Sequence, residues 1–353
     1  MHATEPNRVM SADNSEVLLP LRNLFNTVKC TRDRVRDGES NESSGMFNLS
    51  NFWETLNQAV KATSQEATKL SLIFSKPPVP SEEDCAKIAE SVQKSVLTLS
   101  TVYFWLPKSQ GITLRKAIRD ATADVLDGLV QLLDVILSST LQSLSQEQLM
   151  STGGVWVACD QFDQLPKDNR GAVLRVVTSH VSLVKDALEE MEQALTEAQD
   201  PFGDILEDDD DDEIVARGNQ DTYWSESDRQ LISQCQGLMK ASGACLRKLS
   251  SAIKNNGRVD TEENITQLDD LADAAKEISP SVDDLTLSLY PPVHRSAVEQ
   301  NVCKLSCVLK KMLEITRWCH VCLEADVSWV EFLSGAVDHN LEKIKSLLLH
   351  SSS

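Results

Sequence analysis

Four cysteines near the carboxyl end have the spacing closest to that of a metal site. Cys303 and Cys307 form a C-x3-C pair, and Cys319 and Cys322 form a C-x2-C pair. Four thiolates can hold zinc. Alternatively, they lie with Val302 in one helical stripe, where a free cysteine packs as a small apolar residue. Structural zinc sites usually sit on turns, and turn residues are missing here, so we expect buried thiols, no metal and no other cofactor.

No other set of residues predicts catalysis. The histidines are scattered along the chain, and no phosphate-binding glycine loop, H-E-x-x-H or G-x-S-x-G motif is present. Carboxylate pairs such as Asp269–Asp270 and Asp283–Asp284 are common on solvated helix faces. Because no nucleophile stands with a base, we expect that the protein is not an enzyme and has no catalytic residue.

The composition is that of a folded protein whose partners are not nucleic acids. Of the 353 residues, 41% are hydrophobic and 25% are charged, which allows two domains with proper cores. The net charge is −20, and no block of Lys and Arg is present that would bind a phosphate backbone. The 13 Gly and 11 Pro cluster between apolar-periodic stretches, which favours helices over sheets.

Three features bear on the compartment. No apolar run approaches the roughly 20 residues that span a bilayer, so we expect no membrane partner. The amino terminus is polar, which predicts no signal peptide. Nine cysteines without a secretory signal indicate reduced thiols. We therefore expect the protein in the cytoplasm and the nucleus.

An acidic segment interrupts the chain. From Asp200 to Asp221 there are ten carboxylates and one base, Arg217, which give a net charge of −9. Like charges packed this closely repel one another, and almost nothing apolar is available for burial. We expect a disordered linker between two helical modules.

Apolar residues spaced three and four apart predict helices on both sides of this segment. Short connections between them predict antiparallel neighbours, as in an up-and-down bundle. The fold is therefore expected to be all-α, with a disordered tail at 1–14, an amino-terminal bundle at 15–199, the acidic linker at 200–222 and a carboxyl-terminal bundle at 223–350. The expected helices cover residues 15–36, 50–74, 81–106, 112–137, a stretch containing 155–162, 169–198, 225–254, 262–278, 281–290, 296–323 and 327–349.

Three serines have the sequence context of phosphorylation sites. Ser225 and Ser227 follow the acidic run, which an acidophilic kinase accepts, but Ser225 with Asp228 also fits a capping box at the start of a long helix, and the cap is favoured. Ser279 with Pro280 is a minimal proline-directed site, but a helix break at this proline is favoured.

Several strings of low degeneracy resemble one family, the cyclin-D-binding proteins, also called GCIP, Maid or HHM. They occur in the right order and cover both halves of the chain, roughly 52–347. The strings are LPK at 106–108, QGITLRK at 110–116, VWVAC at 155–159, EEMEQA at 189–194, YWSE at 223–226, EISPSVDDL at 277–285 and YPP at 290–292.

The resemblance implies an all-helical protein in two parts that acts by binding. Members are negative regulators of the cell cycle that bind D-type cyclins, reduce phosphorylation of the retinoblastoma protein and damp the dependent transcription. The resemblance also implies partnership with adaptor proteins and with helix-loop-helix transcription factors, as a partner without a basic region. A structural or adhesion-type helical-bundle scaffold is the alternative, because fold alone does not decide function.

One short stretch resembles a cyclin-docking motif. Arg22, Leu24 and Phe25 have the form Arg-x-Leu-apolar, in which the guanidinium pairs with acidic residues at the rim of a cyclin's apolar patch and the apolar pair fills it. The same form recurs at 229–232 and partly at 247–249. Alternatively, the apolar residues belong to the core stripe of the first helix and face inward.

Overall fold

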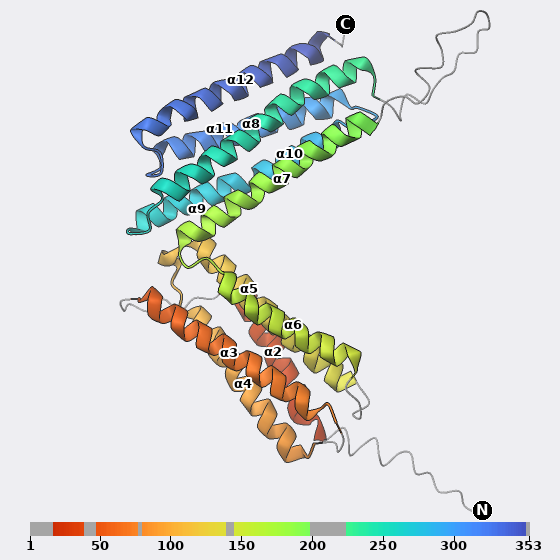
Figure 1. Cartoon of the computed structure of the whole chain (residues 1–353), viewed down its shortest axis with the longest axis vertical. Coiled ribbons are helices and arrows are strands. Elements are labelled where there is room, and N and C mark those ends of the chain that lie inside the picture. The colour runs from red at the N-terminus through yellow and green to blue at the C-terminus, as the bar shows by residue number, and fades with distance from the viewer. Residues whose placement is uncertain (1–16, 39–46, 77–79, 139–144, 198–223, 351–353) are drawn as a thin grey trace, which may run out of the picture. The chain divides into compact units, whose positions relative to one another are not determined.

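A computed structural model of the chain describes residues 17–38, 47–76, 80–138, 145–197 and 224–350. Within these ranges every regular element is a helix. The chain divides into two compact units, Met1–Asp168 and Asn169–Ser353 (Figure 1). The predicted all-α class with two helical bundles is confirmed. The tail expected at 1–14 and the acidic linker expected at 200–222 lie outside the described residues.

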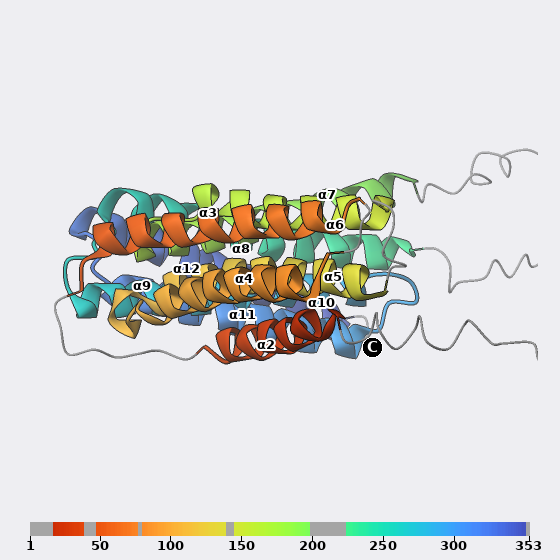
Figure 2. The ribbon, with the colours of Figure 1, turned by 90° about the horizontal axis from the view of Figure 1, so that it is seen from below.

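The first unit is a bundle in which α2 packs against α4 and α5, α3 packs against α4 and α6, and α5 packs against α6. The pairs α2–α4 and α5–α6 can be followed in Figure 1 and Figure 2. Its helices are α2 (Leu19–Asp37), α3 (Leu49–Ile73), α4 (Glu82–Phe104), α5 (Ile112–Ser138) and α6 (Gln146–Asp160), with the 3-10 turns η1 (Lys108–Gln110) and η2 (Gln161–Gln164).

Short polar residues set the helix termini of this unit. The Ser81 hydroxyl accepts a hydrogen bond from the N–H of Asp84 (3.1 Å) and caps α4. Asn48 caps α3 and Ser145 caps α6 in the same way. Helix α2 ends at Gly38, whose φ of 77° lies in the left-handed region that glycine adopts without strain.

The inner faces of the helices form an apolar core. Leu24 on α2, Leu56 on α3, Val92 on α4 and Leu129 on α5 are each at most 1% exposed. Complete burial of such a side chain contributes about 1.5–3 kcal/mol relative to exposure. All four belong to the apolar stripes that the sequence predicts, so the stripes mark the inner faces correctly.

The string QGITLRK joins the end of α4 to α5. Arg115 is 6% exposed, and its guanidinium donates hydrogen bonds to the backbone carbonyls of Leu106 and of Gly38 (3.1 Å to the latter). Its Cζ lies 4.8 Å from the centre of the Tyr103 ring. Gly111, just before α5, has a φ of 109°, which L side chains rarely adopt. One arginine therefore ties the ends of α2 and α4 to the start of α5.

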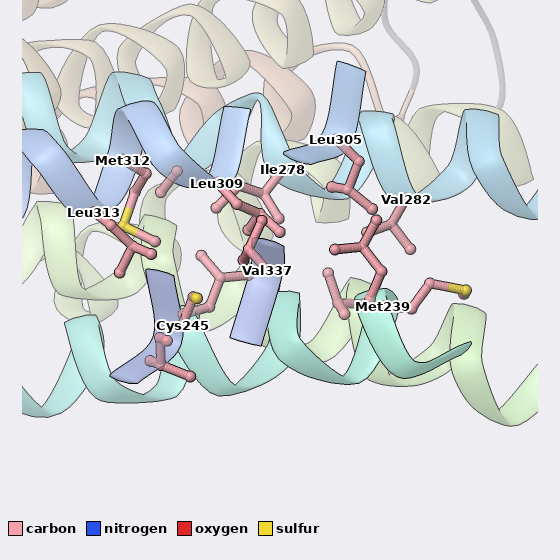
Figure 3. Close-up of a cluster of buried hydrophobic side chains, with 14 of the residues drawn as sticks. Met239, Cys245, Ile278, Val282, Leu305, Leu309, Met312, Leu313 and Val337 are labelled. Carbon is pink, nitrogen blue, oxygen red and sulfur yellow. The ribbon is translucent and has the colours of Figure 1, made fainter. Parts of the chain in front are cut away.

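The second unit is a bundle around one apolar cluster. Figure 3 shows Met239 of α8, Ile278 of α10, Leu309 of α11 and Val337 of α12 in this core, and all four are fully buried. Its helices are α7 (Asn169–Glu197), α8 (Glu226–Asn256), α9 (Glu262–Lys276), α10 (Ile278–Ser288), α11 (Arg295–Trp318) and α12 (Val327–His350), with the 3-10 turn η3 (Glu324–Asp326).

The place of α7 differs from the predicted domain boundary. We expected 15–199 to form one bundle, yet the units divide between Asp168 and Asn169. The reason is the apolar face of α7, where Val177, Val184 and Met191 are buried in the same cluster as residues of α8 to α12. The acidic segment therefore follows α7 and precedes α8, two helices that pack against each other.

The cysteines near the carboxyl end do not share one buried stripe. Helix α11 ends at Trp318, earlier than predicted, because Cys319 adopts an extended backbone conformation (φ −86°, ψ 149°). Cys319 and Cys322 therefore lie in the turn that follows. Cys307 is exposed and Cys303 is half-buried, so full burial holds for Cys319 alone among the four. Burial raises the pKa of the Cys319 thiol to about 11, which keeps it protonated at neutral pH.

Two other helix boundaries differ from the prediction. Helix α6 begins at Gln146, well before the predicted core of 155–162. The break between α9 and α10 lies at Glu277 and not at Pro280. Pro280 sits in the first turn of α10, where its missing N–H removes no helical hydrogen bond.

Two strings that carry the family resemblance meet in the second unit. The Trp224 indole N–H donates a hydrogen bond to the Leu289 carbonyl (2.6 Å), and the rings of Trp224 and Tyr290 lie 5.8 Å apart. Trp224 belongs to YWSE and Tyr290 to YPP. These strings therefore fix the start of α8 against the end of α10.

A neutral histidine closes the turn after α11. His320 Nε2 accepts a hydrogen bond from the N–H of Arg258 (3.0 Å), and Nδ1 lies 2.8 Å from Gln267 Oε1. Because an amide oxygen only accepts, Nδ1 must carry the proton and Nε2 must be unprotonated. Burial and the Arg258 charge lower the pKa of His320, against a smaller opposing effect of Asp260.

We expect the second unit to lose stability as pH falls through about 6.5. The folded-state pKa of His320 lies below the unfolded value, so the unfolded chain binds more protons in this window and protonation favours unfolding. Burial lowers the pKa of His180 in the same direction. Urea unfolding between about pH 7.5 and 5.5 measures the effect. His320→Gln should show a smaller loss than the unaltered chain, and an equal loss would contradict the role of His320.

Candidate partner-binding surface

The predicted docking residues lie on both sides of α2. Arg22 is exposed, Phe25 is half-buried beneath the Lys29 ammonium (5.1 Å to the ring centre), and Leu24 is only 1% exposed. Leu24 packs in the core of the first unit, so a cyclin can receive it only after α2 has left the bundle. Of the arginine and leucine in the Arg-x-Leu motif of α2, the arginine alone is therefore accessible to a partner.

The two recurrences of the motif have the same arrangement. Leu231 is 1% exposed and Leu249 is fully buried, both in the core of the second unit. A pattern of Arg-x-Leu on a helix places the leucine on the apolar stripe. Burial therefore explains why the motif arises several times in a helical chain.

The predicted phosphorylation residues differ in their surroundings. The Ser225 hydroxyl accepts from the N–H of Asp228 (3.2 Å), and the Asp228 carboxylate accepts from the N–H of Ser225 (3.1 Å), which forms the predicted capping box. Ser227 is exposed, and its hydroxyl accepts from Arg295 (2.7 Å). Ser279 is 2% exposed and lies 2.7 Å from His180 Nδ1. Of these three serines, Ser225 and Ser227 are accessible to an enzyme.

A groove between α2 and α4 is the candidate site for a protein partner. Its volume is about 740 Å³, with Pro20 and Asn23 on the α2 side and a wall on α4 in which apolar residues such as Val102 stand among polar ones such as Lys94. Leu97 and Trp105 also line it and are 43% and 48% exposed. The wall runs along α4 from Ala86 to Trp105, which is roughly 28 Å at 1.5 Å per residue. This length suits a helix or an extended segment of another protein.

One residue in the sequence, Leu97, indicates this groove, although the helix periodicity does not identify it. The core stripe of α4 runs through Val92, Val96, Leu99 and Tyr103. Leu97 stands off that stripe, so it is an apolar residue on an outward position. Single exposed apolar residues are normal, and only the hollow next to α2 gives this one a possible role.

The described residues add two observations on chemistry. No three His, Cys, Asp or Glu side chains in the described part gather as a metal site would require. Among the described helices, none has the length and apolar character needed to cross a membrane.

Comparisons with known proteins match both units. The family model described as "Grap2 and cyclin-D-interacting, N-terminal" matches residues 55–197, and its C-terminal counterpart matches residues 206–314. A relative from Danio rerio, "Cyclin-D1-binding protein 1 homolog", is 75% identical over 97% of this chain and 100% of its own length.

Two further relatives extend the similarity. The "Cyclin-D1-binding protein 1 homolog" of Xenopus laevis is 57% identical over 93% of this chain and 98% of its own length. The "Cyclin-D1-binding protein 1" of Homo sapiens is 44% identical over 93% of this chain and 92% of its own length. Since the models cover both units and the relatives nearly the whole chain, this chain belongs to the Grap2 and cyclin-D-interacting family.

Proposed function

We propose that this chain binds a D-type cyclin and thereby restrains progression of the cell cycle. The observation that supports this is the identity of 75% over 97% of the chain to a relative named for binding cyclin D1. The family descriptions name interactions and no reaction. A binding protein needs an accessible surface more than a catalytic pocket, and the α2–α4 groove supplies one.

The groove is the preferred cyclin contact because its apolar residues are already at the surface. Leu97 and Trp105 reach a partner without any unfolding, whereas Leu24 would have to leave the core. Aromatic residues in hollows are typical of the positions that carry most of an interface's binding energy. The contact therefore requires no rearrangement of the bundle.

Binding of a cyclin would act on the associated kinase. In this proposal, less phosphorylation of the retinoblastoma protein follows, with less of the transcription that depends on it. The proposal extends to helix-loop-helix transcription factors and adaptor proteins as further partners, and to action in both cytoplasm and nucleus. Each partner needs its own binding measurement with purified components. A scaffold protein would instead recover cytoskeletal partners and no cyclin.

The test uses the full chain and purified cyclin D1 in a direct affinity measurement. We expect Leu97→Asp together with Trp105→Ala to weaken binding by about tenfold or more, because a charge replaces apolar contact area. The control is Leu287→Asp, on an exposed position of α10 that is 71% accessible. Unchanged binding by the groove variant would exclude the groove, and no binding by the unaltered chain would exclude the function.

Arg22→Ala separates the docking motif from the groove. Arg22 is exposed, so its removal should change the free energy of unfolding by no more than about 0.5 kcal/mol. Leu24→Ala should cost about 2–5 kcal/mol, because it leaves a cavity in the core. Weaker cyclin binding by Arg22→Ala at unchanged stability would support the motif. If its affinity equals that of the unaltered chain, the groove remains as the contact.

A further inference from the structure

Helix α6 is apolar on its outer face as well as its inner face. Val155 and Cys159 are buried against the bundle. On the opposite side Leu149, Met150 and Val157 are 54%, 69% and 61% exposed. Met150 and Val157 are seven residues apart and lie on one line along the helix, and Leu149, next to Met150, widens this stripe at its amino-terminal end. A helix with apolar residues on both faces is normally covered on both faces.

Two adjacent glycines stand in the middle of the outer stripe. A Cβ added at Gly153 or Gly154 would meet no atom within 4 Å, so nothing in the bundle requires a glycine there. Both carry a propensity penalty in a helix interior. Open backbone between larger apolar residues is the surface that another helix needs for a close approach.

The neighbouring face of α5 is acidic. Asp120, Asp124 and Asp134 are exposed and Asp127 is half-exposed, spaced so that all four lie on one side of the helix. Burial, followed by the charges of Asp127 and Asp120, raises the pKa of Asp124 against a smaller opposing effect of Arg36. This face therefore favours a basic partner.

The apolar and acidic stripes lie on adjacent helices. Helices α5 and α6 pack against each other (Figure 1). In this contact Gly128 of α5 lies against Val155 of α6. Asp120 already has Arg119 as an ion-pair partner (2.8 Å), and Asp127 is paired with both Arg32 (3.2 Å) and Arg36 of α2. Asp124 and Asp134 are therefore the carboxylates to which a bound partner would add basic side chains.

We propose that the α5–α6 surface binds an amphipathic helix of a partner protein, with its apolar side on Leu149, Met150 and Val157 and its Lys or Arg flank on Asp124 and Asp134. The glycines admit the partner's backbone. A second copy of this chain is a poor occupant, because the carboxylates of the two faces would oppose each other. An anionic membrane is disfavoured for the same reason.

The test measures binding of labelled synthetic peptides to the full chain by fluorescence anisotropy. One peptide of about 18 residues has leucines at helical spacing flanked by Lys and Arg, and its matched partner has Glu at the flanking positions. We expect the basic peptide to bind at least about tenfold more tightly, and the difference to shrink as NaCl rises from about 0.05 to 0.5 M. Equal binding of both peptides would overturn the proposal.

Variants locate the binding to this surface. Gly154→Gln fills the open backbone without a clash in the bundle, and Asp124→Lys with Asp134→Lys reverses the flank; each should weaken the basic peptide about tenfold. The matched control, Glu299→Lys with Glu342→Lys, makes the same charge change on exposed positions of α11 and α12 and should leave binding unchanged. An equal loss of peptide binding by the control variant would show that the peptide is attracted by the net charge alone. It would overturn the assignment of the binding site to α5 and α6.

Discussion

Leu129→Asp is expected to unfold the first unit. Leu129 is fully buried on α5, and an isolated carboxylate there would have to shed water without a partner. The cost is several kcal/mol, comparable with the total stability of about 5–15 kcal/mol for a domain. Circular dichroism at room temperature should show a smaller helical signal than that of the unaltered chain. On heating, the melting transition of the first unit should be missing.

The same helix supplies the control. Ile112 is the first residue of α5 and is 64% exposed. Ile112→Asp introduces the same carboxylate at a helix amino terminus, where a negative charge is favourable by about 0.3–1 kcal/mol. Its melting temperature should stay near that of the unaltered chain. Normal melting of Leu129→Asp would mean that the buried face of α5 has been misassigned.

Arg115→Ala should destabilise the first unit by about 3 kcal/mol or more. The change leaves the buried Leu106 carbonyl without its guanidinium donor, at about 1–3 kcal/mol, and removes the partly buried bond to the Gly38 carbonyl. It also removes the contact with the Tyr103 ring, which is worth about 1–2 kcal/mol. Chemical denaturation of the full chain measures the change. The unfolding transition that comes first should have its midpoint at a lower denaturant concentration than in the unaltered chain.

Two controls test this reading of Arg115. Arg115→Lys keeps the charge but loses the planar fork that reaches two carbonyls, so it should recover only part of the stability. Lys116→Ala, at the exposed neighbour, should change stability by no more than about 0.5 kcal/mol. Full rescue by lysine would show that charge alone matters.

Local sequence predicted the helices well because their signals are local. Apolar stripes and caps such as Ser225 depend on spacings of three and four residues, and the structure has them as expected. The family resemblance is confirmed by the family models and the relatives. Two of its strings contain Arg115 and Trp224, which join helix ends.

Long-range packing was not available from spacing. Nothing local in α7 shows whether Val177 and Met191 face the helices before or after them. Its position before the acidic run therefore placed it in the first bundle. The α2–α4 groove and the outer face of α6 likewise depend on which helices are neighbours. An exposed Leu97 is visible in the sequence, but the hollow beside it is not.

The place of α7 has a consequence for work with fragments of this protein. A cut within the acidic run looks like a cut between domains, but it removes α7 from the core that buries Val184 and Met191. A fragment ending near residue 199 would carry that apolar face exposed, and one starting near 200 would lack a wall of its bundle. If either fragment failed to bind a partner, the failure would then reflect misfolding of the fragment and not the location of the binding site. A division between Asp168 and Asn169 leaves every helix with its own neighbours.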